Sequence, residues 1–237
     1  MNMLKDNPCR RVMLPALNRK ERDCYSLEEA QKFLELLQKE PMDFRTFFTL
    51  AIYGGFRKAE LLGLEWKDID FDSYVISIIQ TSLYSKEKGG TFTDTTKAEG
   101  SRRSLKLPAQ IFDLLREYKI WQSERRLKLG DKWVNTDSLF TTWNGEPMGT
   151  STPLKWLDNF FERTGMRRVT IHSFRHLNAT LLIDAGVDVK TVSASLGHSE
   201  TATTLNIYAH TFAAAQAKAS EAVADALDLK AKVRTKM

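Results

Sequence analysis

The sequence has few cysteines and no long apolar segment. Its 237 residues include only Cys9 and Cys24, and neither stands at metal-ligand spacing from a histidine. No apolar run is long enough to cross a bilayer, and the first 14 residues lack the apolar core of a signal peptide. We therefore expect reduced thiols, no membrane partner and a cytoplasmic location.

The sequence also lacks the motifs that indicate several cofactor-dependent reactions. The chain contains neither a Gly-x-x-x-x-Gly-Lys-Ser/Thr nor a Gly-x-Gly-x-x-Gly phosphate loop. It also shows no carboxylate cluster of the kind that holds two catalytic metal ions. We therefore expect a protein without cofactors whose chemistry is independent of metals.

Positive charge is in moderate excess and occurs in pairs. The net charge of +5 and the pI of about 9.1 suit a polyanionic partner, although many soluble proteins are mildly basic. Any one pair of basic residues is equally compatible with a solvated protein surface. Several pairs together favour a nucleic acid as the binding partner. The arginines that we expect to bind DNA are Arg10, Arg11, Arg102, Arg103, Arg167 and Arg168.

Local signals predict a mostly α protein with a small antiparallel β-sheet, an α+β fold. Ser26 and Glu29 form a capping box at the start of a helix that ends before Pro41. Residues 74–107 contain β-rich stretches on either side of a polar, glycine-containing loop and predict the sheet. Further helices are expected over residues 44–53, 57–64, 108–129, 153–163, 174–185, 189–196 and 213–229, with one more beginning at Ser199 or Thr201.

Three of the four histidines fall within one stretch, residues 172–208. In a helix, residues three and four positions apart are neighbours, so His172, Arg175 and His176 would share one face. They stand at the expected helix N-terminus, which favours anions, and arginine binds phosphate with paired hydrogen bonds. The spacing therefore predicts a phosphate pocket.

A second short helix follows in the same stretch. Asp188 can cap residues 189–196, and Gly197 can end them in the left-handed conformation, which projects His198. The next expected helix carries Tyr208. Single histidines and tyrosines usually pack in a core, but this ordered combination favours a functional site.

The three pieces His-x-x-Arg-His, Leu-Gly-His-Ser and a tyrosine one helix later resemble the C-terminal part of the tyrosine recombinase (phage-type integrase) family. The resemblance covers roughly residues 25–212. Gly-Phe-Arg-Lys-Ala-Glu-Leu at residues 55–61 is similar to the family's Gly-Leu-Arg-x-x-Glu-Leu, which identifies Arg57 as its first catalytic arginine. The family also carries a lysine at a β-turn before Ser-x-Arg, and Lys97 matches it better than Lys86 or Lys88.

The resemblance implies a catalytic set for cleaving DNA strands. Its members are Arg57, Lys97, His172, Arg175, His198 and Tyr208, with Glu60 and His176 in supporting roles. Two arginines would neutralise the non-bridging phosphate oxygens. Tyr208 would be the nucleophile, and its phenol, with a pKa of about 10, needs a base such as His172. Lys97 would protonate the departing 5′ oxygen, and His198 would hydrogen-bond the phosphate.

The resemblance further implies a site-specific DNA recombinase of a bacterial mobile element, such as a conjugative transposon or prophage. Such enzymes form a 3′-phosphotyrosine link without ATP and act as homotetramers on double-stranded DNA. We expect a basic linker or arm at residues 1–24, a catalytic domain at 25–212, and a helix and tail at 213–237 that pack on a neighbouring subunit or on their own. The chain would be a catalytic-domain fragment or a natural short form.

Three alternatives remain open at this point. A type IB topoisomerase would use the same tyrosine to relax DNA without exchanging strands. A non-catalytic DNA-binding module would use residues 189–196 as part of a helix-turn-helix. A zinc enzyme would use His172 and His176, but Ser173 stands where the His-Glu-x-x-His motif requires glutamate.

Overall fold

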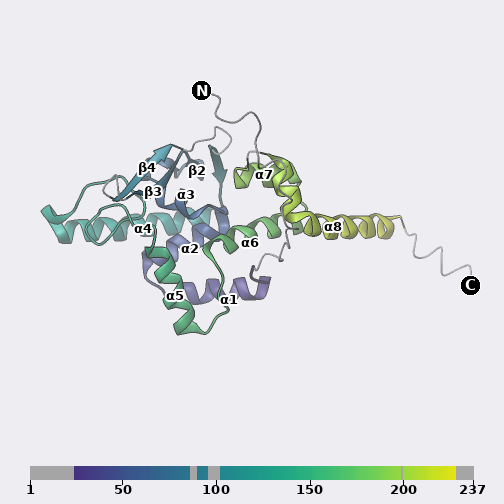
Figure 1. Cartoon of the computed structure of the whole chain (residues 1–237), viewed down its shortest axis with the longest axis horizontal. Coiled ribbons are helices and arrows are strands. Elements are labelled where there is room, and N and C mark those ends of the chain that lie inside the picture. Colours follow the sequence, from purple (N-terminus) through teal and green to yellow (C-terminus); the bar gives the residue numbers. More distant parts are fainter. Residues whose placement is uncertain (1–23, 86–89, 96–101, 199, 228–237) are drawn as a thin grey trace, which may run out of the picture.

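The computed structural model describes residues 24–85, 90–95, 102–198 and 200–227 (Figure 1). Its α-helices are α1 (Leu27–Leu37), α2 (Met42–Gly54), α3 (Lys58–Gly63), α4 (Ala109–Leu129), α5 (Thr152–Thr164), α6 (Ile171–Asp184), α7 (Val189–Leu196) and α8 (Thr201–Ala226). The strands are β1 (Ile69–Asp70), β2 (Val75–Ile78), β3 (Gln80–Ser85), β4 (Gly90–Thr95) and β5 (Arg103–Lys106), and short 3-10 helices span Trp66–Asp68 and Gly130–Lys132. The predicted mostly α fold with a small antiparallel sheet is confirmed.

Aromatic side chains form the centre of the main core, where α1, α2, α5 and α6 meet. The ring of Phe33 lies with its centroid 5.0 Å from that of Phe160 and 4.9 Å from that of Phe174. Phe48 of α2 packs edge-on against both Phe33 and Phe174. Because α2 and α6 share this core, the start of α6 is held at a fixed place beside the end of α2.

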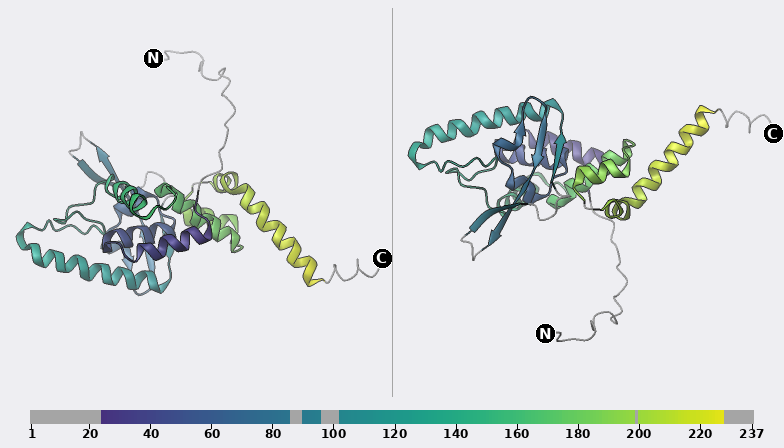
Figure 2. Two further views of the ribbon diagram at one scale, coloured as in Figure 1. Left: turned by 90° about the horizontal axis from the view of Figure 1, so that it is seen from below. Right: turned by 90° about the horizontal axis from the view of Figure 1, so that it is seen from above.

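The strands do not form the single sheet that residues 74–107 predicted. In the described residues, β1, β2 and β5 make one antiparallel sheet, and β3 pairs only with β4 in a separate hairpin (Figure 2). The hairpin leaves the sheet because it packs on α3. A Cβ on Gly63 would lie 2.9 Å from the backbone nitrogen of Ser82, so only glycine allows this contact. Gln80 ties the hairpin further by donating to the Gly63 carbonyl, at 2.9 Å.

Capping side chains set the ends of α6 and α7. The Thr170 hydroxyl accepts from the Ser173 backbone N–H, so α6 begins at Ile171 and not at residue 174 as predicted. His172 therefore lies in the first turn of α6. Asp188 caps α7 through the N–H groups of residues 190 and 191, and Gly197 ends it with φ of 62°, as predicted.

Helix α8 consists of two helical segments that meet at a kink. It departs from helical geometry only at Tyr208, with φ of −114° and ψ of 20°. The C-terminal part of α8, drawn in yellow, extends away from the body of the protein in all views (Figures 1 and 2). No helix in the described part of the chain combines the length and apolar character of a membrane span.

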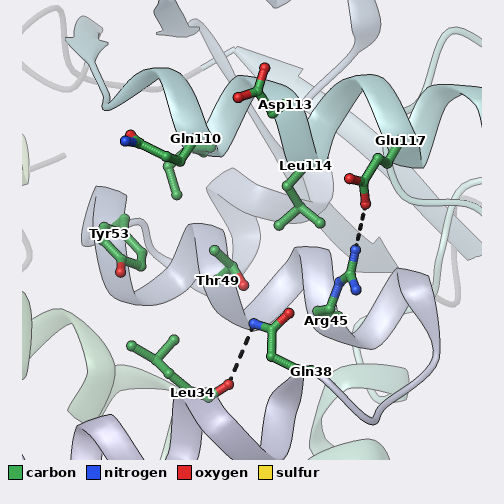
Figure 3. Close-up of a pocket in the computed structure, with 10 residues that line it drawn as sticks. Leu34, Gln38, Arg45, Thr49, Tyr53, Gln110, Asp113, Leu114 and Glu117 are labelled. Atoms are coloured by element: carbon green, nitrogen blue, oxygen red, sulfur yellow. Dashed lines mark hydrogen bonds and ion pairs between the residues drawn. The ribbon is translucent and has the colours of Figure 1, made fainter.

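A cleft of about 310 Å³ lies between α1, α2 and α4. Arg45 of α2 donates to Glu117 of α4 across one end of it, at 2.7 Å (Figure 3). Thr49 and Leu114 also line the cleft. None of the candidate catalytic residues lines it, so the cleft is distinct from the candidate active site described next.

Candidate active site

The first element of the site is an arginine–glutamate pair at the start of α3. Gly55, with φ of 57°, turns the chain after α2 and places Arg57 directly before the first residue of α3. The Arg57 guanidinium donates to the Glu60 carboxylate at 2.6 Å, and the Arg57 backbone N–H donates to the same carboxylate at 2.8 Å. Glu60 thus holds both the backbone and the side chain of Arg57.

Arg175 meets Arg57 at the C-terminal end of α7. One nitrogen of Arg175 donates to the Gly55 carbonyl at 2.9 Å, and another donates to the Leu196 carbonyl. Arg57 donates to the next carbonyl along the chain, that of Gly197, at 3.0 Å. Two guanidinium groups that are 118 residues apart in sequence are therefore brought together on consecutive carbonyls.

Burial changes the electrostatics of this pair. The side chain of Arg175 is fully buried, and burial, followed by the charge of Arg57, lowers the pKa of Arg175 to about 9. Arg175 is therefore still a cation at neutral pH. Arg57 is more open, with 37% of its side chain exposed, so an anion from solvent can approach the pair from its side.

Tyr208 lies against α6, in the same chain. Its hydroxyl is 2.6 Å from Nδ1 of His176, and both side chains are buried. The His172 ring stands edge-on to His176, with 4.6 Å between the ring centroids. His176, which we expected only to support the site, is thus in direct contact with the phenol, and the neighbouring His172 is exposed.

His198 completes the group just beyond Gly197. Its Nδ1 lies 2.7 Å from the Thr204 hydroxyl of α8. When Thr204 donates in this bond, the imidazole carries its proton on Nε2 and presents a donor to an anion. Burial, followed by the charges of Arg175, Arg57 and Arg103, lowers the pKa of His198 to about 4, so the ring is neutral at neutral pH.

The neutral His198 predicts a loss of stability in mild acid. The unfolded ring protonates near pH 6.5 and the folded ring only near pH 4, so the unfolded state binds more protons in between. The free energy of unfolding should therefore fall as the pH drops from about 6.5 to about 4. Urea unfolding should show that His198→Gln removes on the order of 1 kcal/mol of this fall, after discounting for solvent screening. His210→Gln, at an exposed histidine of α8, should leave the fall unchanged, and an unchanged fall in His198→Gln would contradict the prediction.

Arg103, which we expected to bind DNA, has a different environment. Its side chain is only 7% exposed and donates to both oxygens of Glu60, at 3.0 and 2.9 Å. The Arg103 guanidinium is therefore enclosed and ion-paired with Glu60, unlike that of an exposed surface arginine, and its assignment to DNA binding stays a prediction. A count of paired arginines could not reveal this ion pair, since Glu60 lies 43 residues earlier in the chain.

The other arginines expected to contact DNA are distributed differently. Arg102 is exposed. Arg167 donates to Glu29 at 2.7 and 2.8 Å, and Arg168 pairs with Asp158 at 2.8 Å and with Glu162 at 3.2 Å. A DNA phosphate would have to compete with carboxylates at both positions. Arg10, Arg11, Lys86, Lys88 and Lys97 lie outside the described residues.

The histidines do not form a recognisable metal site with other residues. Within the described ranges, no three His, Cys, Asp or Glu side chains cluster in an arrangement that suits a metal ion. In addition, Nδ1 of His176 is already engaged with Tyr208. What the described side chains offer is a set of cations and neutral donors around one phenol.

A fold and site of this kind define a family of proteins. The chain belongs to the phage integrase family, because residues 25–215 match the family described as "Phage integrase family". It is similar to a protein described as tyrosine recombinase XerC-like from Caldanaerobacter subterraneus subsp. tengcongensis, at 32% identity over 94% of this chain and 60% of the relative. It is also similar to the ICEBs1 integrase of Bacillus subtilis (strain 168), at 30% identity over 95% of this chain and 60% of the relative. The chain thus spans about 60% of the length of these relatives.

Solved structures share the fold. The Tn1549 transposon integrase, in complex with transposon right end DNA, superposes with a TM-score of 0.70 at 22% identity, covering 86% of this chain and 67% of that chain. The XerH site-specific recombinase, bound to difH substrate, gives a TM-score of 0.61 at 26% identity, covering 85% of this chain and 52% of that chain.

Proposed function

We propose that this chain cleaves and rejoins DNA strands as a site-specific recombinase that integrates and excises a mobile genetic element. Its partner is double-stranded DNA carrying the recombination sites, and its location is the bacterial cytoplasm. The observation that carries the proposal is the meeting of Arg57 and Arg175 on consecutive carbonyls, within the same small region as His198. Tyr208 is held by His176 on the helix that carries Arg175.

Cleavage begins with attack of the Tyr208 oxygen on a backbone phosphorus. The phenol loses its proton to an imidazole, and His176 is positioned for this at 2.6 Å, with His172 beside it. Arg57 and Arg175 stabilise the negative charge that grows on the non-bridging oxygens, and His198 donates one further hydrogen bond. The 5′ oxygen leaves and takes a proton, for which Lys97 is the candidate donor.

Rejoining reverses these steps with a different strand. The 3′-phosphotyrosine bond conserves the energy of the broken phosphodiester, so the free 5′ hydroxyl of a partner strand can attack it without ATP. Residues 25–212 would form the catalytic domain, and residues 1–24 would be a basic arm. Residues 213–237 would pack on a neighbouring subunit of a homotetramer, for which the extended end of α8 is suited.

The relatives support recombination over simple relaxation. They are described as tyrosine recombinases and integrases, and one of them belongs to ICEBs1. The structural neighbours were solved on transposon DNA and on difH substrate, which supports DNA as the partner here. The topoisomerase alternative is accordingly not favoured.

The test is capture of the covalent intermediate. Nicked duplexes with randomised sequence around the nick are incubated with the chain, because a nick near the cleavage point releases a short strand and traps the adduct. We expect complexes that survive denaturing detergent, with a nucleotide-modified peptide that contains Tyr208 in mass spectrometry. No adduct from any sequence, or an adduct on another residue, would refute the proposal.

A second substrate separates exchange from relaxation. Two duplexes of different length, both carrying a sequence recovered from the adducts, are incubated together. A recombinase yields products of recombined length, whereas a topoisomerase only relaxes a supercoiled circle that carries the same sequence. Relaxation without recombined products would favour the alternative.

A further inference from the structure

Arg103 is a buried cation that the catalytic set does not include. It lies at the start of β5, and its side chain is 7% exposed. Its two terminal nitrogens donate to the two oxygens of Glu60, a geometry that only arginine can supply. The same carboxylate also holds Arg57, so one buried anion joins two arginines that are 46 residues apart in sequence.

The remaining nitrogen of Arg103 binds α7. Its Nε donates to the Ser195 carbonyl at 2.6 Å, directly before the carbonyls that accept from Arg175 and Arg57. The final carbonyls of a helix lack helical partners and carry partial negative charge. Here the carbonyls of residues 193 and 194 accept from the N–H groups of residues 198 and 197, and those of residues 195, 196 and 197 each accept from one arginine.

The backbone at this point is shaped to admit Arg103. Gly197 has φ of 62°, and a Cβ at this position would lie 2.5 Å from a terminal nitrogen of Arg103. A side chain on residue 197 would therefore displace the arginine. The glycine that turns the chain toward His198 is also the residue that makes room for Arg103.

This arrangement is not the one that stability alone would favour. Removing a carboxylate and an arginine from water is costly, and apolar residues of similar volume are often as stable as a buried ion pair. What the ion pair does provide is fixed geometry, because β5, α3 and the end of α7 are bonded through one side chain.

We propose that Arg103 is a positioning residue for DNA cleavage, which sets Glu60, and through it Arg57, against the end of α7 that carries His198. The proposal rests on the function proposed above. It implies that Arg103 acts on the rate of cleavage and not on the affinity for DNA. In enzymes generally, misplacing a group at the reacting centre by about 1 Å can lower the rate about 100-fold.

The first experiment separates the rate of adduct formation from DNA affinity. Arg103→Lys keeps the positive charge that buried Glu60 needs but loses the paired bonds, so the variant should still fold. At saturating nicked DNA, adduct formation should be slower by about 10- to 100-fold, with the Kd for DNA unchanged within about twofold. Arg116→Lys, at a surface arginine of α4 that pairs with Asp113, is the control and should form adducts at the unaltered rate.

The second experiment measures the rate of adduct formation as a function of pH. This pH dependence would not change if Arg103 only stabilised the fold. Burial raises the pKa of Glu60, but the hydrogen bond and charge of Arg103, and then the backbone bond and charge of Arg57, keep it below its usual value. In Arg103→Met the contribution of Arg103 is lost and the pKa of Glu60 rises. Adduct formation by this variant should therefore decline in acid at a higher pH than in the unaltered chain, because protonated Glu60 no longer holds Arg57.

The two variants of Arg103 distinguish a positioning role from a DNA contact. Slower cleavage at saturating DNA in Arg103→Lys, with unchanged affinity and a shifted acid limb in Arg103→Met, supports the proposal. Weaker DNA binding with an unchanged rate at saturation would make Arg103 a DNA contact and overturn it, as would rates equal to those of the unaltered chain. If the unaltered chain itself forms no adduct, the proposed function fails, which is a different result from failure of the Arg103 variants alone.

Discussion

Tyr208→Phe is expected to eliminate the covalent protein–DNA adduct, with a loss of at least about 1,000-fold that reaches the detection limit. Phenylalanine keeps the ring that packs against α6 but has no oxygen to attack phosphorus. Single-turnover incubation with nicked duplexes, followed by denaturing electrophoresis, measures the effect. DNA affinity should be retained, because the hydroxyl is bonded to His176 and not exposed at the surface.

The same substitution should have only a small effect on folding. It removes the buried hydrogen bond to His176 at 2.6 Å, and a bond of this kind contributes about 1 kcal/mol to the free energy of unfolding. Tyr53→Phe is the matched control, because Tyr53 is a partly exposed tyrosine of α2 that should keep full adduct formation. Equal adduct formation by Tyr208→Phe and the unaltered chain would show that another residue is the nucleophile.

Local sequence signals predicted the helices that carry the site because those signals act over a few residues. Ser26 with Glu29, and Asp188 with Gly197, mark helix ends through bonds made within one turn. The pairing of Arg57 with Glu60 follows from the same short-range geometry. Such contacts need no knowledge of the tertiary fold, so the sequence was sufficient to predict them.

Contacts between distant elements were not predictable in this way. The hairpin of β3 and β4 is separate from the predicted sheet because Gly63, which has no side chain, lets β3 pack closely on α3. The β-propensity of the hairpin residues carries no information about this contact. The bond from His176 to Tyr208 depends on the direction in which α8 crosses α6. In each case, the contact that sets the structure joins residues of two different secondary-structure elements.

Charge was the least reliable guide to function. Arg103 and Arg167 look alike in the sequence as members of basic pairs, yet Arg103 is buried on Glu60 and Arg167 binds Glu29 near the surface. Only the position of the opposing carboxylate distinguishes the enclosed arginine from the one near the surface. The family resemblance predicted the convergence of Arg57 and Arg175 because it carries information on tertiary structure that composition lacks.

Arg175→Lys is expected to lower the rate of adduct formation at saturating DNA by at least about 100-fold. The guanidinium bridges the carbonyls of Gly55 and Leu196, and a lysine ammonium cannot reproduce that fork. The variant therefore loses both the alignment of the charge and the paired donors to a phosphate. Removal of one oxyanion donor typically costs 10²–10³ in kcat, or roughly 3–4 kcal/mol.

Stability measurements show whether the lost activity reflects chemistry or unfolding. Leaving one buried carbonyl without its donor should lower the free energy of unfolding by about 1–3 kcal/mol, so the variant should remain folded at 25 °C. Arg163→Lys, at a surface arginine that pairs with Glu40, is the control and should change neither stability nor rate. A folded Arg175→Lys that cleaves at the normal rate would mean that Arg175 is only a structural bridge between α2 and α7. The negative charge of the transition state would then have to be met by Arg57 and His198 alone among the described residues.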